Sequence, residues 1–299
     1  MRQQTIGNSF VIEGKGLHTG LNIHLKALPA PANHGIKIKR VDMEDQPEIE
    51  AIADNVIETV RGTVLKIGNS QVSTIEHAMA AFYAAGIDNC LFEVDGPEFP
   101  ILDGSSRFYA EQLKTVGIVE QNIEKEYITI TGTTECSITT GSNIKAYPAD
   151  KLELEVLIGF DSPVLDRQEA SLNTLEKFPD EIAYARTFVF VREIEPLLNM
   201  NLIKGGDLKN AIVIYDKIMS QDALDTLTEK LNQPKINASE LGYLTGKLNF
   251  ENEPARHKLL DVLGDLALTG KPIKGRIVAN YPGHTINTEF AKLLRKNYL

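Results

Sequence analysis

The sequence predicts an α+β fold made of two similar halves. In each half, short stretches of alternating apolar and polar residues precede helical segments, so strands and helices come in blocks. The similar order suggests a duplication, although no residue-level repeat accompanies it. The glycine motifs of dinucleotide sites, P-loops and α/β-hydrolases do not occur in the sequence, which disfavours those three classes.

The composition predicts a soluble globular protein with one large or two ordinary domains. The chain has 299 residues, of which 42% are hydrophobic, enough for sizeable cores. With 41 acidic and 31 basic residues, the formal charge is −10. This charge argues against a nucleic-acid partner and favours a metal or small-molecule substrate.

The two cysteines, Cys90 and Cys136, lie in strand-like segments and lack C-x-x-C spacing. This placement disfavours both a disulfide framework and a thiolate zinc site. The N-terminal residues lack the apolar core of a signal peptide. No apolar run approaches the ~20 residues of a membrane span. We therefore expect a cytoplasmic location with at most peripheral membrane contact.

The first half, expected to span residues 1–122, shows several strands joined by turns. Alternation and turn residues place these strands within residues 5–28, 35–41, 48–53, 62–67 and 89–94. The loop after the last strand is dense in turn residues, and its acidic members are expected to serve backbone hydrogen bonding. These acidic residues are Asp95, Glu98 and Asp103.

Two helices are predicted in the first half, at residues 73–86 and 107–116. Ser73 and Glu76 match a capping box at the start of the first helix, and Gly86 matches its C′ position. Glu76 therefore has a purely structural alternative to any catalytic role.

The second half, expected to span residues 127–299, follows a polar connector at 120–126, which we interpret as the domain boundary. Strands are predicted within residues 127–131, 136–139, 152–160, 211–215 and 275–279. Helices are predicted within residues 193–200, 253–270 and 288–296.

The helix at 253–270 has one polar and one apolar face. At 100° per residue, His257, Asp261 and Asp265 share a side, while leucines fill the other. Residues four apart are neighbours on a helix, so His257 and Asp261 can share a cation. They supply two of the three protein ligands of a catalytic zinc site. The alternative is a solvated polar stripe.

His77 is the candidate third ligand, because Glu76 beside it would be a base for a water that attacks a carbonyl. His284, expected in a Gly-rich loop, would supply charge and a proton to a departing amine, with Asp265 orienting it. Two further candidates could donate to the oxyanion or the substrate: Thr187 and Lys258.

His18 lies in a tight turn bounded by glycines, from which a side chain can be aimed at a site. The alternative is a structural turn residue. His24 and His34 are expected to be surface residues.

Six segments of the sequence resemble the motif series of the UDP-3-O-acyl-N-acetylglucosamine deacetylases, in that family's order. They cover the chain from near its start to about residue 290. The segments are 16–20 (GLHTG), 73–77 (STIEH), 95–105 (DGPEFPILDGS), 185–188 (ARTF), 256–266 (RHKLLDVLGDL) and 283–287 (GHTIN).

The resemblance implies zinc-dependent hydrolysis of the 2-N-acetyl group of UDP-3-O-(3-hydroxyacyl)-N-acetylglucosamine, releasing acetate. This step commits Gram-negative bacteria to lipid A synthesis. The implied zinc ligands are His77, His257 and Asp261, with one ion per chain. The other implied roles are general base for Glu76, acid or oxyanion stabiliser for His284 backed by Asp265, oxyanion donor for Thr187, and substrate contacts for Lys258, Phe188 and His18.

The resemblance also implies two α+β sandwich domains packed through their helix layers, each with a small insert. The second insert, roughly 188–215, would form an apolar passage for the acyl chain, although ordinary core packing is the alternative for its residues. Those residues are Val189, Phe190, Val191, Ile194, Leu197, Leu198 and Ile203. No residue is assigned to the pyrophosphate.

Family members also occur fused to a hydroxyacyl-carrier-protein dehydratase, so a longer natural product extending past Leu299 is one expectation. Two other functions stay open. One is a zinc amidase for another N-acyl sugar, and the other is a catalytically silent nucleotide-sugar-binding protein on the same scaffold.

Overall fold

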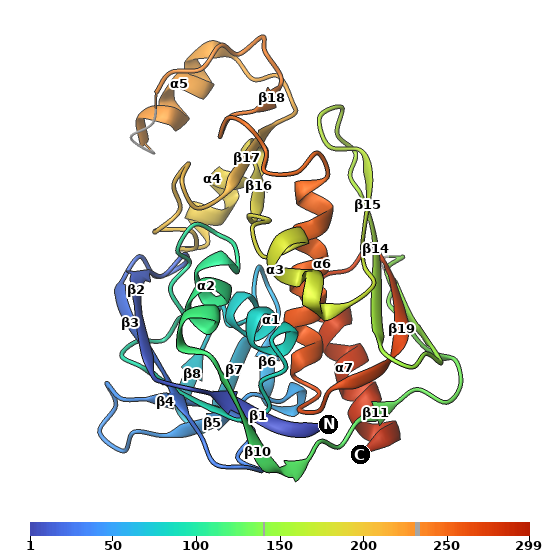
Figure 1. The fold of residues 1–299 in the computed structure, drawn as a ribbon. Coiled ribbons are helices and arrows are strands. Elements are labelled where there is room, and N and C mark those ends of the chain that lie inside the picture. The colour runs from blue at the N-terminus through green and yellow to red at the C-terminus, as the bar shows by residue number, and fades with distance from the viewer. Residues whose placement is uncertain (140, 231–233) are drawn as a thin grey trace.

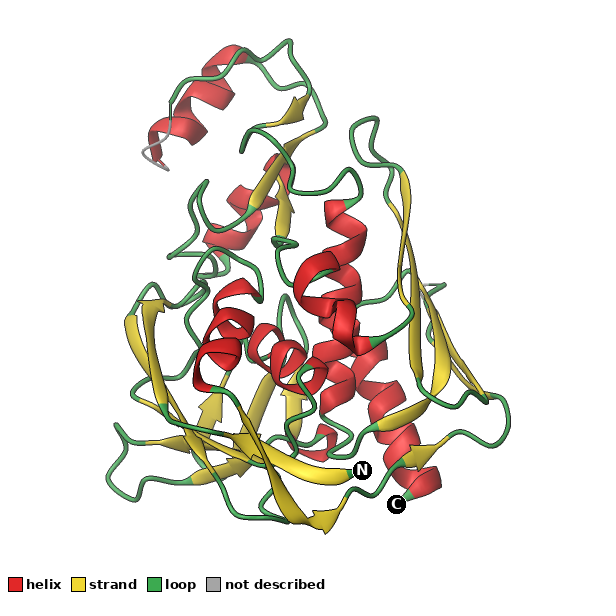
Figure 2. Cartoon of the chain, viewed as in Figure 1, coloured by secondary structure: helices red, strands yellow, loops and turns green. Residues whose placement is uncertain are grey.

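Two sheets enclose four helices in the structure, a computed structural model that describes residues 1–139, 141–230 and 234–299 (Figure 1). The four helices are α1 (Glu76–Ala84), α2 (Arg107–Val116), α6 (Glu253–Ala267) and α7 (His284–Tyr298). Figure 2 shows them between the strands of the N-terminal half and those of the C-terminal half. The predicted α+β class is confirmed.

The first sheet has the strand order β2-β3-β9-β4-β5. Its strands are β2 (Phe10–Lys15), β3 (Asn22–Pro29), β9 (Cys90–Val94), β4 (Ile36–Arg40) and β5 (Glu48–Glu50). Only the β4–β9 pair is parallel among these four pairings. Alternate residues of β3, namely Ile23, Leu25 and Ala27, face the core, as its sequence pattern predicts.

The second sheet repeats this topology strand for strand, in the order β12-β13-β19-β14-β15, with β11 also pairing with β19. Its strands are β11 (Ile128–Thr129), β12 (Thr134–Ser137), β13 (Asn143–Tyr147), β14 (Leu152–Gly159), β15 (Arg167–Leu172) and β19 (Ile273–Asn280). The β14–β19 pair is parallel, like β4–β9. In each half one helix, α1 or α6, leads into the central strand, so the two helices occupy equivalent positions.

Each half also carries a smaller three-stranded sheet. In the first half this sheet consists of β6 (Val56–Glu58), β7 (Val64–Ile67) and β8 (Ser70–Val72), and η1 (Ala53–Asn55) precedes it. In the second half it consists of β16 (Phe188–Phe190), β17 (Ile212–Tyr215) and β18 (Gly242–Tyr243), with α4 (Val191–Asn199) and α5 (Gln221–Lys230) beside it. The short η2 (Leu175–Lys177) and α3 (Phe178–Glu181) precede β16.

Several local predictions are wrong. Residues Ile118–Glu124 form β10, which pairs with β1 (Arg2–Ile6), so the polar segment 120–126 is largely a strand. The domain boundary placed there stays a prediction. The last helix begins at His284, because Gly283 provides its N-cap in extended conformation. No helix in the described ranges is long and apolar enough to cross a bilayer.

The capping box predicted at Ser73 and Glu76 is also wrong. Helix α1 begins at Glu76 itself, after Ile75, and no side-chain cap is formed there. The Ser73 hydroxyl donates instead to the carbonyl oxygen of Pro97. Gly86, with a φ of 75°, does follow the helix end as predicted.

Helices α1 and α6 meet at Gly264 without room for a larger side chain. A Cβ atom added to Gly264 would lie 2.2 Å from the carbonyl oxygen of Glu76 and 2.9 Å from its carbonyl carbon. Both atoms belong to backbone, so only separation of the helices would relieve the overlap. Helix α6 is buried on both faces here, which rules out the solvated polar stripe.

Replacing Gly264 by alanine should push α1 and α6 apart. We expect a loss of about 1–3 kcal/mol in unfolding free energy. Any metal held by the candidate ligands His77 of α1 and His257 and Asp261 of α6 should also bind more weakly. Denaturant unfolding and metal titration measure the two effects. Gly132→Ala is the control, since its added methyl meets open space. Equal behaviour of the two variants would contradict the proposed close contact.

Candidate metal and catalytic site

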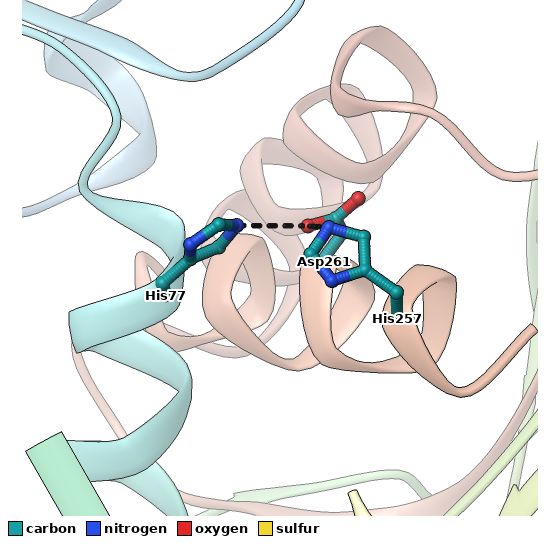
Figure 3. Close-up of side chains that lie close together, drawn as sticks. All are labelled: His77, His257 and Asp261. Atoms are coloured by element: carbon teal, nitrogen blue, oxygen red, sulfur yellow. Dashed lines mark ion pairs between the residues drawn. The ribbon is translucent and has the colours of Figure 1, made fainter. Parts of the chain in front are cut away.

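Three buried side chains from α1 and α6 converge on one point (Figure 3). His77 comes from α1, and His257 and Asp261 come from successive turns of α6. One ligand atom from each lies within 4.8 Å of the others, a group that could hold a metal ion. The Asp261 Oδ1 atom is 3.4 Å from His257 Nε2 and 4.0 Å from His77 Nε2. The predicted constellation is therefore assembled.

The two histidines are suited to act as neutral nitrogen ligands. Burial lowers the pKa of His77 to about 3, with the nearby His257 adding to the effect. Burial also lowers the pKa of His257. The carbonyl oxygen of Ala185 lies 3.0 Å from His257 Nδ1 and fits a proton there, which leaves Nε2 with its lone pair toward Asp261.

Asp261 offers a carboxylate oxygen to the same point. Burial disfavours its charge, but the positive charges of Lys258 and His284 oppose burial and lower the pKa of Asp261. Lys258 Nζ donates to Oδ2 at 2.8 Å. Oδ1 is buried and accepts no hydrogen bond. An unpartnered buried carboxylate oxygen facing two imidazole nitrogens fits a divalent metal ion.

Glu76 lies next to this group and turns its carboxylate into the site. Its Oε2 accepts a hydrogen bond from the backbone N–H of Thr63 at 3.2 Å. Burial raises the pKa of Glu76 to about 7, against the opposing effect of His284. A carboxylate with a pKa near neutrality can both take up and release a proton, as a general base requires.

His284 and Asp265 form a pair beside the metal-ligand group, in which Asp265 is fully buried and His284 largely so. His284 Nδ1 is 2.9 Å from Asp265 Oδ2, and His284 Nε2 is 3.9 Å from Asp261 Oδ2. Burial alone would lower the pKa of His284, but the charges of Asp265 and Asp261 raise it to about 9. His284 is thus a cation beside two neutral histidines.

An apolar cavity of about 340 Å³ opens from this site. The sequence-predicted residues His18, Thr187, Phe188 and Lys258 line it, as do the three residues of the metal-ligand group. Five of the seven residues expected in the passage line its walls: Val189, Val191, Ile194, Leu197 and Ile203. Phe190 and Leu198 pack in the cores instead.

The cavity extends beyond the passage residues 188–215 expected from the sequence. Leu224, Leu227 and Thr228 of α5 form part of its wall, together with Ile236 and Leu244. The four apolar residues among them belong to a small second core between α4, α5 and β17. The sequence analysis did not place these residues in the cavity wall. Residues 216–245 are mostly polar, and only one face of α5 is apolar.

Thr187 is held in place from both halves of the chain. Its N–H donates to the carbonyl oxygen of Gly104 at 2.7 Å. Gly104 has a φ of 79°, and a Cβ atom there would meet Asn210 O at 2.1 Å. Glycine is therefore required at this contact.

A buried ion pair fixes the residue before Thr187. Arg186 donates from its Nε and backbone N–H to Glu253 Oε1, at 2.8 and 3.0 Å. Glu253 is fully buried in the first turn of α6. The sequence analysis missed this pair, whose members are 67 residues apart. Only the position of Arg186 beside Thr187 in a motif hinted at a role.

His18 is positioned by Glu98, which is fully buried. Glu98 accepts hydrogen bonds from the backbone N–H groups of His18 and Thr19 at 2.8 and 2.9 Å. Glu98 thus accepts hydrogen bonds from the backbone, as predicted for the acidic residues of this loop. His18 lines the cavity, and its Nε2 lies 3.3 Å from the carbonyl oxygen of Arg61.

A buried carboxylate with a raised pKa, a cationic imidazole and a group that could hold a metal, all at an apolar cavity, are typical of a hydrolytic enzyme. The family model described as UDP-3-O-acyl N-acetylglycosamine deacetylase matches residues 3–236 and 231–296. The chain belongs to this family, which confirms the resemblance found in the sequence.

Similar proteins carry two kinds of name. The bifunctional enzymes LpxC/FabZ of Bacteroides thetaiotaomicron and Porphyromonas gingivalis are 54% and 57% identical, each over 99% of this chain. The chain spans 65% and 64% of their lengths. The UDP-3-O-acyl-N-acetylglucosamine deacetylase of Xylella fastidiosa is 34% identical over 97% of this chain and 89% of its own length.

Truncating Arg186 to alanine should destabilise the fold, because it leaves the Glu253 carboxylate buried without its ion pair. We expect a loss of about 3 kcal/mol in unfolding free energy, measured by denaturant titration. Arg167→Ala breaks a pair in which both side chains are well exposed, and serves as the control with little change. Similar losses in both variants would contradict this account.

Proposed function

We propose that this chain is a zinc-dependent deacetylase. It hydrolyses the 2-N-acetyl group of UDP-3-O-(3-hydroxyacyl)-N-acetylglucosamine and releases acetate, the committed step of lipid A biosynthesis. The observation that carries the proposal is the group of His77, His257 and Asp261, which lines an apolar cavity together with Glu76. Membership of the deacetylase family supports it.

The three ligand residues would hold one zinc ion per chain. Two neutral imidazoles and one carboxylate match the donor set of catalytic zinc sites, which keep a further position open. The unpartnered Asp261 Oδ1 supports this assignment. When bound, zinc polarises an amide carbonyl and acidifies water.

Glu76 would take a proton from the water that attacks the acetyl carbonyl carbon. The amide C–N bond then breaks, acetate leaves, and the sugar amine takes up a proton. His284, cationic and held by Asp265, would supply that proton or stabilise the oxyanion. Thr187, on the cavity wall, would add a further hydrogen bond to the oxyanion.

Lys258, Phe188 and His18 would contact the sugar nucleotide in the same cavity, which all three line. Lys258 Nζ lies 5.5 Å from the centre of the Phe188 ring, so a charge and an aromatic face adjoin each other there. The apolar wall beyond them would take the acyl chain, since it offers few polar atoms to a ligand.

A cytoplasmic location belongs to the same proposal, in keeping with the free cysteines Cys90 and Cys136. The proposal also includes a longer natural protein with a second enzyme domain after Leu299. The bifunctional names of the relatives from Bacteroides and Porphyromonas support it. Mass measurement of the protein from native cells would test it.

Removing the Glu76 carboxylate should abolish deacetylation while leaving the metal in place. We expect Glu76→Ala to lower kcat about 100- to 10,000-fold, since it removes a general base. Metal analysis of the purified protein should still find one zinc per chain. His77→Ala should lose zinc instead, and Glu120→Ala, at an exposed carboxylate, should change neither quantity. Full activity of Glu76→Ala would remove it as the base.

The acyl chain should contribute strongly to catalysis. A substrate without the 3-O-acyl group should show at least about a 100-fold lower kcat/KM, because each buried CH₂ contributes ~0.8 kcal/mol. Leu224→Asn in the cavity wall should reduce this preference, whereas Asp222→Asn on the exposed side of α5 should not. Equal rates for both substrates would favour a different N-acyl sugar.

A further inference from the structure

A loop of the small β6–β8 sheet reaches the centre of the site. It connects β6 to β7 and ends at Thr63, which is fully buried. None of the six sequence segments of the family resemblance contains Thr63. None of the roles assigned above involves Thr63, although its polar atoms contact Glu76 and Asp265.

Thr63 contacts both the proposed base and the proposed acid pair. Its backbone N–H donates to Glu76 Oε2 at 3.2 Å. Its hydroxyl donates to Asp265 Oδ1 at 2.5 Å and lies 3.4 Å from His284 Nδ1. One residue thus bridges two groups that come from α1 and α6.

The hydroxyl completes the hydrogen bonding of the Asp265 carboxylate. Oδ2 of Asp265 accepts from Asn287 Nδ2 at 2.8 Å and faces His284 Nδ1 at 2.9 Å. Oδ1 accepts from Thr63. Asp265 is fully buried, so loss of the Thr63 hydroxyl would leave Oδ1 without that donor and free the carboxylate to turn. The imidazole of His284 would turn with it.

The loop itself is tied to its surroundings. Arg61 pairs with Glu193 of α4 at 2.9 Å, and the hydroxyls of Thr59 and Thr285 are 2.8 Å apart. These contacts join the loop to the second small sheet unit and to α7. The position of Thr63 is therefore set by both halves of the chain.

We propose that Thr63 is a positioning residue for the reaction. Its hydroxyl orients Asp265, and through it His284, while its N–H holds the Glu76 carboxylate. The two proton-handling groups are then placed relative to each other by a single residue. The β6–β8 sheet acts as the support that delivers this residue. This inference rests on the proposed deacetylase function.

Thr63→Val tests the hydroxyl alone, because valine keeps the shape and the backbone N–H. We expect kcat to fall roughly 10- to 100-fold, with little change in KM and in bound zinc. Thr63→Ser, which keeps the hydroxyl, should recover most of the activity. Thr5→Val is the matched control. Thr5 is also a buried threonine, and its hydroxyl donates to the carbonyl oxygen of Asn89, away from the cavity.

A double-mutant cycle with Asp265→Ala separates positioning from general destabilisation. If Thr63 acts through Asp265, adding Thr63→Val to Asp265→Ala should lower kcat less than about threefold further. The proposal would be overturned if the kcat losses of Thr63→Val and Asp265→Ala multiplied in the double variant. Equal kcat losses in Thr63→Val and Thr63→Ser would also overturn it. So would an unchanged kcat in Thr63→Val. An inactive parent enzyme with zinc bound would instead reject the proposed function.

Discussion

The close packing of α1 against α6 is the constraint on which the rest of the structure depends. The two helices approach until Gly264 touches the backbone of Glu76. This contact places His77 of α1 opposite His257 and Asp261 of α6. The two helices are equivalent, because each precedes the central strand of its sheet and the two sheets have the same topology. The candidate metal site therefore lies where the halves of the repeated fold meet.

Electrostatic interactions then give similar side chains different protonation states within the same site. Burial keeps His77 and His257 neutral, whereas the carboxylates of Asp265 and Asp261 keep His284 charged. Burial raises the pKa of Glu76, while the charge of Lys258 holds that of Asp261 low despite burial. Separated pKa values of this kind are what the proposed ligands, base and acid require within one pocket.

The two smaller sheets contribute to the site in different ways. The β6–β8 sheet delivers Thr63 between Glu76 and Asp265. The β16–β18 sheet, with α4 and α5, builds a second core around an apolar cavity. The large sheets therefore form the scaffold, and the smaller sheets supply the apolar cavity and the contacts of Thr63. Arg186 and Glu253 connect the second addition to α6.

The sequence by itself determined the α+β class and the pairing of His257 with Asp261, because helical periodicity is a local property. It also indicated His77, Glu76 and His284 through their motifs. Only the tertiary structure decided that Glu76 lines the cavity instead of capping its helix, that Thr63 bridges Glu76 and Asp265, and that α5 forms part of the cavity wall. Those contacts join residues distant in the sequence, and they depend on how sheets and helices pack, which local patterns do not encode.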